Sequence, residues 1–129
     1  MKFLSRLNLL PTFLLVVACS NNLSSSTIVT ATSPDDDFGI EVQSGIPSTS
    51  YGPHSVRVYI LRGDQRDLLI RTPLFNDGRS LDASNAEVRF NGDSVEVCLR
   101  GAVQADKLIT FNAQSKDYSV RDGDCVFSS

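Results

Sequence analysis

The feature that most restricts the fold is an Asn-Gly pair between two runs of alternating apolar and polar residues. The run before it is 87–90 (EVRF), and the run after Asn91-Gly92 is 93–99 (DSVEVCL). Asn-Gly in this setting is the strongest short-range signal for a β-hairpin with a type I′ turn, because both central residues need a positive φ. Counting outward from the turn predicts three cross-strand pairs, namely Phe90–Asp93, Val88–Val95 and Ala86–Val97. One face of the hairpin should therefore be mostly apolar and the other polar.

Further short apolar runs separated by turn residues lie on both sides of this hairpin. The predicted strands outside it are 55–61, 68–75, 107–112 and 117–121, with a last candidate at 125–127. Pro73 has no backbone N–H to donate, so the end of the 68–75 strand should lie at a sheet edge. No amphipathic helix is evident, although 83–87 and 103–107 suit a single helical turn. Six to seven strands at this spacing predict an all-β fold, a small antiparallel β-sandwich or barrel-like domain over 51–129.

The first 18 residues form a different kind of segment. Lys2 and Arg6 precede an apolar stretch, 7–18, which holds 12 residues and includes Pro11. A membrane-spanning helix needs roughly 20 mostly apolar residues, so this stretch is too short to be one. A short positive region followed by a brief apolar run is typical of a secretory signal peptide.

The end of that segment, Val16-Val17-Ala18-Cys19, resembles the lipobox of bacterial lipoproteins. An aliphatic residue stands three places before the cysteine and a small residue stands directly before it. The resemblance implies cleavage before Cys19, a diacylglyceryl thioether on its sulfur and an acyl chain on its new N-terminus. Three acyl chains would hold the protein durably on a bilayer, whereas one holds only marginally. A signal peptide cut without lipidation is the alternative.

The predicted location is the outer membrane of a Gram-negative cell envelope. Ser20 follows Cys19, and the sorting rule that the resemblance implies retains aspartate at that position in the inner membrane. Removal of Lys2 and Arg6 with the signal peptide leaves 10 basic and 15 acidic side chains, so the mature net charge is −5. No basic run exists to neutralise a phosphate backbone, which argues against nucleic acid as a partner.

The lipobox resemblance also bears on the cysteines, since acylation of Cys19 leaves only Cys98 and Cys125. Disulfides form and persist in exported proteins, so these two residues are predicted to pair. Cys98 should lie on the polar face of the hairpin, and the disulfide would then clamp the C-terminal segment across or beside it. Two buried free thiols are the alternative.

The segment 19–50 has the composition of a flexible tether. It is rich in serine, threonine and asparagine, contains Asp35-Asp36-Asp37 and offers little to bury. We therefore expect a lipidated leash that holds the β domain off the bilayer, with the aspartates simply solvated. Two alternatives stay open, because the alternation in 38–42 suits an extra edge strand and Ile28-Val29 suits docking on a partner.

Catalytic chemistry finds little support in this sequence. His54 is the single histidine, and we expect it to be a solvent-exposed loop residue rather than a base held by a third group. Several histidine or thiolate ligands for a transition metal are missing. Most carboxylates are expected to be turn residues rather than a pair of glycosidase acids. The tripeptide Arg62-Gly63-Asp64 is likewise expected to be a turn rather than an integrin-type motif. We predict no enzymatic activity, no catalytic or metal-binding residue and no cofactor.

Protein binding is the leading functional hypothesis, because arginine and aromatic residues are enriched where proteins bind proteins. The candidate residues are Arg62, Arg66, Arg79 and Tyr118, and the edge near 68–75 would accept a strand from a partner. The predicted function is a membrane-anchored, non-enzymatic module of the inhibitor, immunity or exclusion type. The alternative is a structural or assembly accessory of an outer-membrane or secretion complex, with the tether as its docking segment. An envelope hydrolase is a third class.

Overall fold

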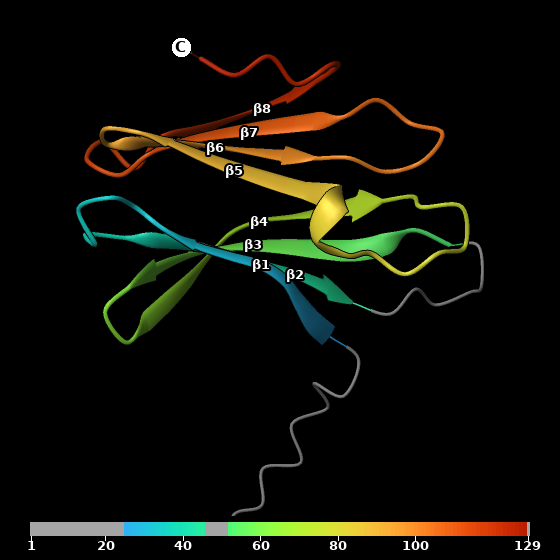
Figure 1. The fold of residues 1–129 in the computed structure, drawn as a ribbon, viewed down its shortest axis with the longest axis horizontal. Helices are drawn as coiled ribbons and strands as arrows, with labels where there is room; N and C mark the ends of the chain where they lie inside the picture. The colour runs from blue at the N-terminus through green and yellow to red at the C-terminus, as the bar shows by residue number, and fades with distance from the viewer. Residues whose placement is uncertain (1–24, 46–51, 129) are drawn as a thin grey trace, which may run out of the picture.

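The strands follow one another as two antiparallel meanders (Figure 1). The computed structural model describes residues 25–45 and 52–128. In these residues the strands are β1 (Ser25–Thr32), β2 (Gly39–Gly45), β3 (His54–Arg62), β4 (Gln65–Leu74), β5 (Ala86–Asn91), β6 (Ser94–Leu99), β7 (Lys107–Asn112) and β8 (Tyr118–Asp122), and the 3₁₀ helix is η2 (Ala83–Asn85). Strands β1 to β4 form one sheet, called sheet A, and β5 to β8 form a second, sheet B. The all-β prediction is confirmed.

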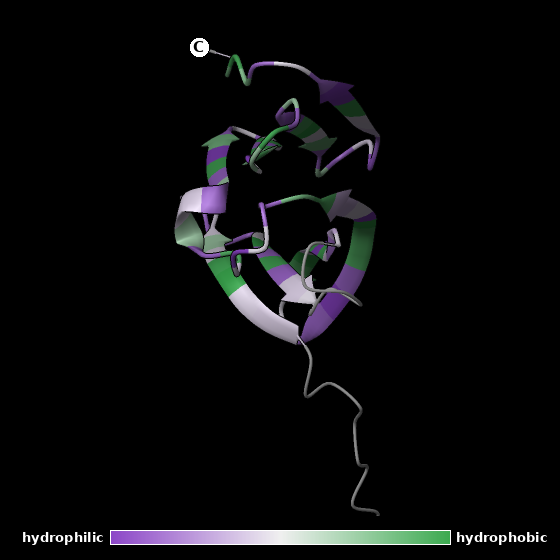
Figure 2. Cartoon of the chain, turned by 90° about the vertical axis from the view of Figure 1, so that its right-hand side faces the viewer, coloured by the Kyte–Doolittle hydropathy of each residue, from purple (hydrophilic) through white to green (hydrophobic). Residues whose placement is uncertain are grey.

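Alternation along the strands places apolar side chains between the two sheets, which Figure 2 shows as separate layers. In β3, residues 56, 58 and 60 are buried while the residues between them are partly exposed. In β6, Val95, Val97 and Leu99 are buried on the matching face of sheet B. Side chains from both sheets belong to one core cluster. The sheets therefore pack face to face, and the sandwich is the predicted architecture that the chain adopts.

The predicted tether is wrong for the part of it that the structure describes. Strands β1 and β2 lie within 19–50 and bring the count in the described residues to eight rather than six or seven. Ile40 and Val42 of β2 are fully buried, and they lie opposite Ile60 and Val58 of β3. The sandwich therefore includes residues well before 51.

Amino-acid composition did not indicate these strands, because their exposed positions carry the same residue types as a linker. Threonine is favoured on a half-exposed strand, and β1 is an edge strand with mostly serine, threonine and small apolar residues. The alternation in 38–42 is the signal that proves correct, although β2 is an inner strand of sheet A and not an edge. The remainder of the predicted tether, 19–24 and 46–50, lies outside the described residues.

The hairpin of β5 and β6 forms, but its predicted register is wrong by two residues. Asn91 pairs with Ser94 and Val88 with Val97, so the two turn residues are Gly92 and Asp93. Gly92 has a φ of 59° while Asp93 has a negative φ, the pattern of a type II′ rather than a type I′ turn. The N–H of Ala113 donates to the carbonyl of Asp93 (2.7 Å). This contact comes from the turn between β7 and β8, beyond the reach of a local turn rule.

A shift by two residues leaves every side chain on its predicted face, because side chains alternate with a period of two. Val88 and Val97 remain on the face toward sheet A, and Glu87 lies opposite Cys98 on the outer face of sheet B. The predicted orientation of Cys98 is therefore confirmed.

Strand β4 is an edge strand of sheet A, as Pro73 predicted. Its pairing with β3 shifts between Val58 and Tyr59, so that Leu68 lies opposite Tyr59 and Leu69 is left without a partner in the ladder. The extra residue is a β-bulge, which bends the strand and re-aims its side chains. Leu68 is 49% exposed as a result of this placement at the edge.

Backbone contacts hold the loops at the ends of β4 and β6. One set extends the pairing of β5 with β6, and another joins sheet B to sheet A. Asn85, the last residue of η2, donates from Nδ2 to the carbonyl of Arg100 (2.7 Å) and accepts the N–H of Arg100 on its own carbonyl (2.8 Å). The N–H of Ala102 donates to the carbonyl of Phe75, just after β4 (2.8 Å). A Cβ at Gly101 would lie 2.2 Å from that same oxygen. This close approach of two backbones accepts only glycine.

Candidate binding surface

The predicted lipidation residue, Cys19, lies outside the described residues, as does the whole signal segment. Lipidation therefore stays a prediction. In residues 25–45 and 52–128, no helix is long and apolar enough to cross a membrane.

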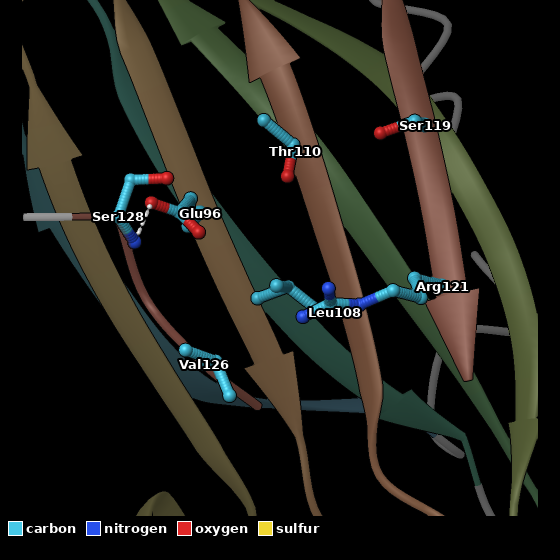
Figure 3. Close-up of a pocket in the computed structure, with 7 residues that line it drawn as sticks. All are labelled: Glu96, Leu108, Thr110, Ser119, Arg121, Val126 and Ser128. Atoms are coloured by element: carbon cyan, nitrogen blue, oxygen red, sulfur yellow. Dashed lines mark hydrogen bonds between the residues drawn. The ribbon is translucent and has the colours of Figure 1, made fainter. Parts of the chain in front are cut away.

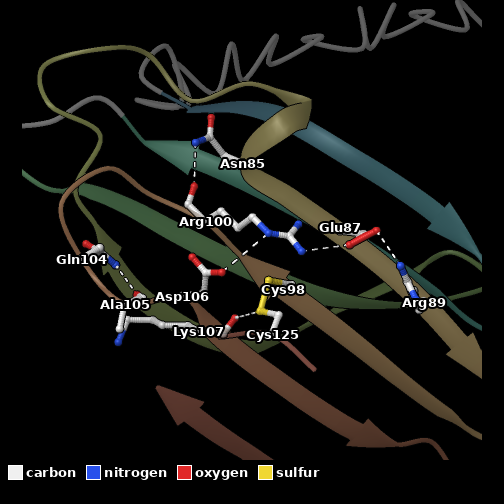
Figure 4. Close-up of polar contacts among 10 residues, drawn as sticks. All are labelled: Asn85, Glu87, Arg89, Cys98, Arg100, Gln104, Ala105, Asp106, Lys107 and Cys125. Carbon is white, nitrogen blue, oxygen red and sulfur yellow. Dashed lines mark hydrogen bonds and ion pairs between the residues drawn. A yellow bond between two sulfur atoms is a disulfide. The ribbon is translucent and has the colours of Figure 1, made fainter. Parts of the chain in front are cut away.

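The predicted disulfide between Cys98 and Cys125 is present, with the two Cα atoms 6.1 Å apart (Figure 4). It holds the C-terminal segment, residues 123–128, against the outer face of sheet B. Phe127 of this segment places its ring centre 4.0 Å from the guanidinium of Arg89. The N–H of Ser128 donates to Oε1 of Glu96 (2.9 Å). The segment thus acts as a strap across sheet B.

The strap explains why the outer face of sheet B is partly buried. Glu96, Cys98 and Leu108 point away from the core, yet all three are buried. Beside the strap lies a polar hollow of about 190 Å³, lined by Glu96, Leu108, Thr110, Ser119, Arg121, Val126 and Ser128 (Figure 3). It offers one carboxylate, three hydroxyls and a guanidinium. A glycosidase needs two carboxyl groups facing each other, and this hollow supplies one.

Next to the disulfide, ion pairs link β5 to the loop after β6 (Figure 4). Glu87 accepts hydrogen bonds from Arg89 and Arg100, each at 3.2 Å, and Arg100 also lies 3.7 Å from Asp106. The hydrogen bonds from Arg89 and then Arg100 hold the pKa of the Glu87 carboxyl below its ordinary value. Exposed ion pairs of this kind contribute little to the stability of the fold, and their main effect is to fix the orientation of the side chains.

The residues near the disulfide do not make a metal centre. Ligand atoms of Cys98, Asp106 and Cys125 lie within 4.8 Å of one another. Both sulfur atoms are bonded to each other, and a metal binds the thiolate form of cysteine. In the described part of the chain, this cluster therefore lacks the ligands that a structural metal needs.

His54 differs from its prediction as an exposed loop residue. It is the first residue of β3 and is 5% exposed. Its Nε2 lies 2.8 Å from the carbonyl oxygen of Arg79, and its Nδ1 lies 3.4 Å from that of Gly45. The imidazole thus joins the end of β2 to the loop after β4, and it has no carboxylate or nucleophile among these partners.

The four predicted binding residues do not converge on one site. Arg66 forms an ion pair with Glu41 (3.0 Å) and lies 4.6 Å from the ring centre of Tyr59, on the outer face of sheet A. Arg79 follows β4 and contacts His54 through its backbone. These two arginines are held by the fold at separate places. Arg62 and Tyr118 are connected through Phe111, which lines a hollow with Arg62 and pairs with Tyr118, on the side of the sandwich formed by β4, β7 and β8.

On that side lies a hollow of about 180 Å³, here called the side hollow. Its apolar residues are Ile60, Leu68, Leu69 and Phe111, and its charged residues are Arg62, Asp67 and Lys116. Ile60 and Phe111 are buried and form the floor, whereas Leu68 is half exposed at the margin. Arg62 donates from Nη2 to the carbonyl of Ala113 (3.0 Å), which ties β3 to the turn between β7 and β8.

Most of the side hollow could not be predicted from the sequence. Phe111 and Lys116 sit on β7 and the turn after it, about 50 positions from Arg62 and Asp67, and no local pattern connects them. The signal that did point to this side was Pro73, which placed the neighbouring strand at an edge.

Comparisons with family models, curated proteins and solved structures found no match to this chain.

Proposed function

We propose that the chain is a membrane-anchored, non-enzymatic envelope lipoprotein whose β-sandwich binds another protein, in the manner of an inhibitor, immunity or exclusion protein. The side hollow is the observation that carries this proposal. It combines half-exposed Leu68 and a buried aromatic floor with charges of both signs around it. Apolar anchors inside a polar rim are the usual anatomy of a protein interface.

The size of the side hollow favours a protein partner over a small molecule. Ligand pockets commonly measure about 300–1,000 Å³, and the side hollow holds about 180 Å³. A single apolar side chain of a partner suits this space, with Arg62, Asp67 and Lys116 placed to meet polar groups around it. The remaining contact area would come from the exposed edge of β4.

Site-specific crosslinking in intact cells of the source organism tests this surface. A photoreactive residue replaces Leu68 in the full-length chain, and the same residue at Val103, which is 91% exposed far from the hollow, serves as the control. We expect one protein to be captured from position 68 and not from 103. Loss of that product with Lys116→Glu, in a chain that keeps its disulfide, would support the hollow as the contact. Equal capture from both positions would contradict it.

The identity of the captured protein separates the two predicted roles. An envelope protein of the same organism would favour the assembly accessory. Capture only after host or phage material is added would favour the inhibitor.

The anchor has its own test. The N-terminal peptide from the membrane fraction should carry three acyl chains on Cys19 by mass spectrometry, and Cys19→Ala should release the protein from the membrane. An unmodified N-terminus at another residue would contradict lipidation while leaving the binding surface standing.

A further inference from the structure

Strand β8 is one of the two edge strands of sheet B, and all five of its residues are exposed. Tyr118 and Val120 pair with Phe111 and Ile109 of β7 and therefore share their core-facing side. Phe111 and Ile109 are buried, yet Tyr118 is 55% and Val120 is 42% exposed. An apolar half of β8 thus projects beyond the sandwich.

The other three edge strands carry a proline, a register shift or a neighbouring strand that blocks further pairing, and β8, a short strand with two charged residues, carries none of these three. Strand β4 has Pro73 and a bulge at Leu69, and β1 has a register shift between Thr27 and Val29. Strand β5 lies beside β1 of the other sheet. Strand β8 is free of proline and pairs with β7 in unbroken register. Natural edges are usually guarded by such devices, so the open edge of β8 calls for an occupant.

The hydrogen-bonding groups on the free edge can be assigned from the pairs that β8 makes. The N–H of Asn112 donates to the carbonyl of Asp117 (3.0 Å), and the N–H of Gly123 donates to that of Asp106 (2.9 Å). Odd-numbered residues of this strand therefore direct their backbone N–H and C=O groups toward β7. Because the direction alternates in an antiparallel ladder, Tyr118 and Val120 direct their N–H and C=O groups to the free edge.

We propose that this edge pairs with β8 of a second copy of the chain, antiparallel and centred on Ser119. In this register, Tyr118 lies opposite Val120 of the other copy, as a hydrogen-bonded pair. Asp117 lies opposite Arg121, and the two-fold symmetry repeats each pair. Sheet B of the two copies then forms one continuous sheet. The pairing goes beyond the proposed function and does not depend on it.

Charge complementarity selects a second copy and this register. Asp117 and Arg121 make no ion pair in residues 25–45 and 52–128, and they flank Ser119 at equal distance along the strand. Opposite charges directly across a ladder stabilise it, as do aromatic and β-branched pairs. A register centred on Val120 would place Arg121 opposite Ser119 and leave Asp117 without a charged partner. The edge is complementary to itself.

A disulfide trap across the two-fold axis tests the pairing in the full-length exported chain. Ser119 would face its own copy as a non-hydrogen-bonded pair with Cα atoms about 4.5 Å apart, within the range for a disulfide. We expect Ser119→Cys to run as a covalent dimer of twice the mass on a non-reducing gel. Val120→Cys is the matched control, because its two copies would lie more than about 7 Å apart.

Charge reversal provides the second readout in the Ser119→Cys chain. Asp117→Arg or Arg121→Asp alone should lower the dimer fraction about tenfold, because each turns both symmetric pairs from attraction to repulsion. The double reversal should restore it. Peptide mapping for an intact Cys98–Cys125 bond verifies that each variant is folded.

Four outcomes would overturn the proposal. These are a monomer for Ser119→Cys with the native disulfide intact, equal or greater dimer from Val120→Cys, a mixed disulfide with another protein, or charge reversals without effect. A failure here leaves the capture experiment at Leu68 unaffected, because that experiment reads a product of different mass.

Discussion

Gly101 shows how one residue can determine the approach of two sheets. A Cβ at this position would lie 2.2 Å from the carbonyl oxygen of Phe75 and 3.1 Å from Leu74. The backbone oxygen cannot move freely, because it already accepts the N–H of Ala102. The loop after β6 is therefore bound to the end of β4 by contact as well as by hydrogen bonding.

We predict that Gly101→Ala lowers the free energy of unfolding by about 2 kcal/mol or more, as overpacking of a tight site does. Chemical denaturation of the oxidised protein measures it. Gly45→Ala is the matched control, since its Cβ would meet its nearest atom at 3.4 Å. Equal stability of the two variants would show that the loop adjusts and that the approach is not as restrictive as described.

The ion pairs of Glu87 predict how the stability of the fold depends on pH. Its folded-state pKa is lowered by hydrogen bonds from Arg89 and then Arg100, while in the unfolded chain the pKa returns to about 4.3. The stabilisation is therefore present above that value and is lost as the pH falls through the lower, folded-state pKa. We expect Glu87→Gln to make the melting temperature less dependent on pH between about 5 and 3, with the turn variant Asp64→Asn as control. A decline as steep as that of the native chain would contradict the assignment.

At the scale of elements, the strap is the part of the fold that depends most on one covalent bond. Residues 123–128 contact sheet B through Cys125, Phe127 and Ser128, and they bury Glu96, which has no ion pair in the described part of the chain. Without the strap, this carboxylate and its neighbour Leu108 return to solvent.

Replacing Cys98 and Cys125 together by serine should lower the melting temperature by more than about 8 °C. The closed loop spans 27 positions, for which the entropy lost by the unfolded chain corresponds to about 3–4 kcal/mol. Differential scanning calorimetry of the two proteins measures the change. An unchanged melting temperature would mean that the strap holds without the bond.

Strand β1 affects how the result of deleting part of the predicted tether would be interpreted. A deletion of 22–33 would test whether the predicted tether docks on an assembly partner. The structure places β1 in that range, beside β2 and its buried Ile40 and Val42. Loss of function after such a deletion would reflect loss of a sheet edge.

At the scale of the whole molecule, the two sheets share one core. Phe38, Ile40 and Val58 of sheet A and its loops belong to the same cluster as Val97 and Ile109 of sheet B. Each sheet would expose this apolar face to water if the other left, at a cost in burial free energy, so we expect each to depend on the other. The meander order of each sheet brings only sequence neighbours into pairs, and the core supplies the contacts between them.

We therefore predict that the sheets unfold together in one two-state transition. Hydrogen exchange measured along a denaturant series should give the same midpoint for amides of β3 and β6. Midpoints that differ beyond error would show that one sheet survives the loss of the other.

Local pattern was enough for several features. Gly63-Asp64 forms a turn as predicted, 107–112 is a strand with the predicted bounds, and Cys98 lies on the predicted face. Each of these depends on backbone preferences or on alternation within a few residues. The chain carries that information in its immediate neighbours.

Burial and strand register are determined by tertiary contacts. The turn at Gly92-Asp93 accepts a hydrogen bond from Ala113, which lies 20 positions later. The buried imidazole of His54 contacts the backbone of Gly45 and Arg79, which are equally out of reach of a local pattern. The side hollow gathers residues about 50 positions apart. The sequence alone determined which residues alternate and turn, because those choices are local. Only the packing of one sheet on the other decided which of those faces are covered and which stay open to a partner.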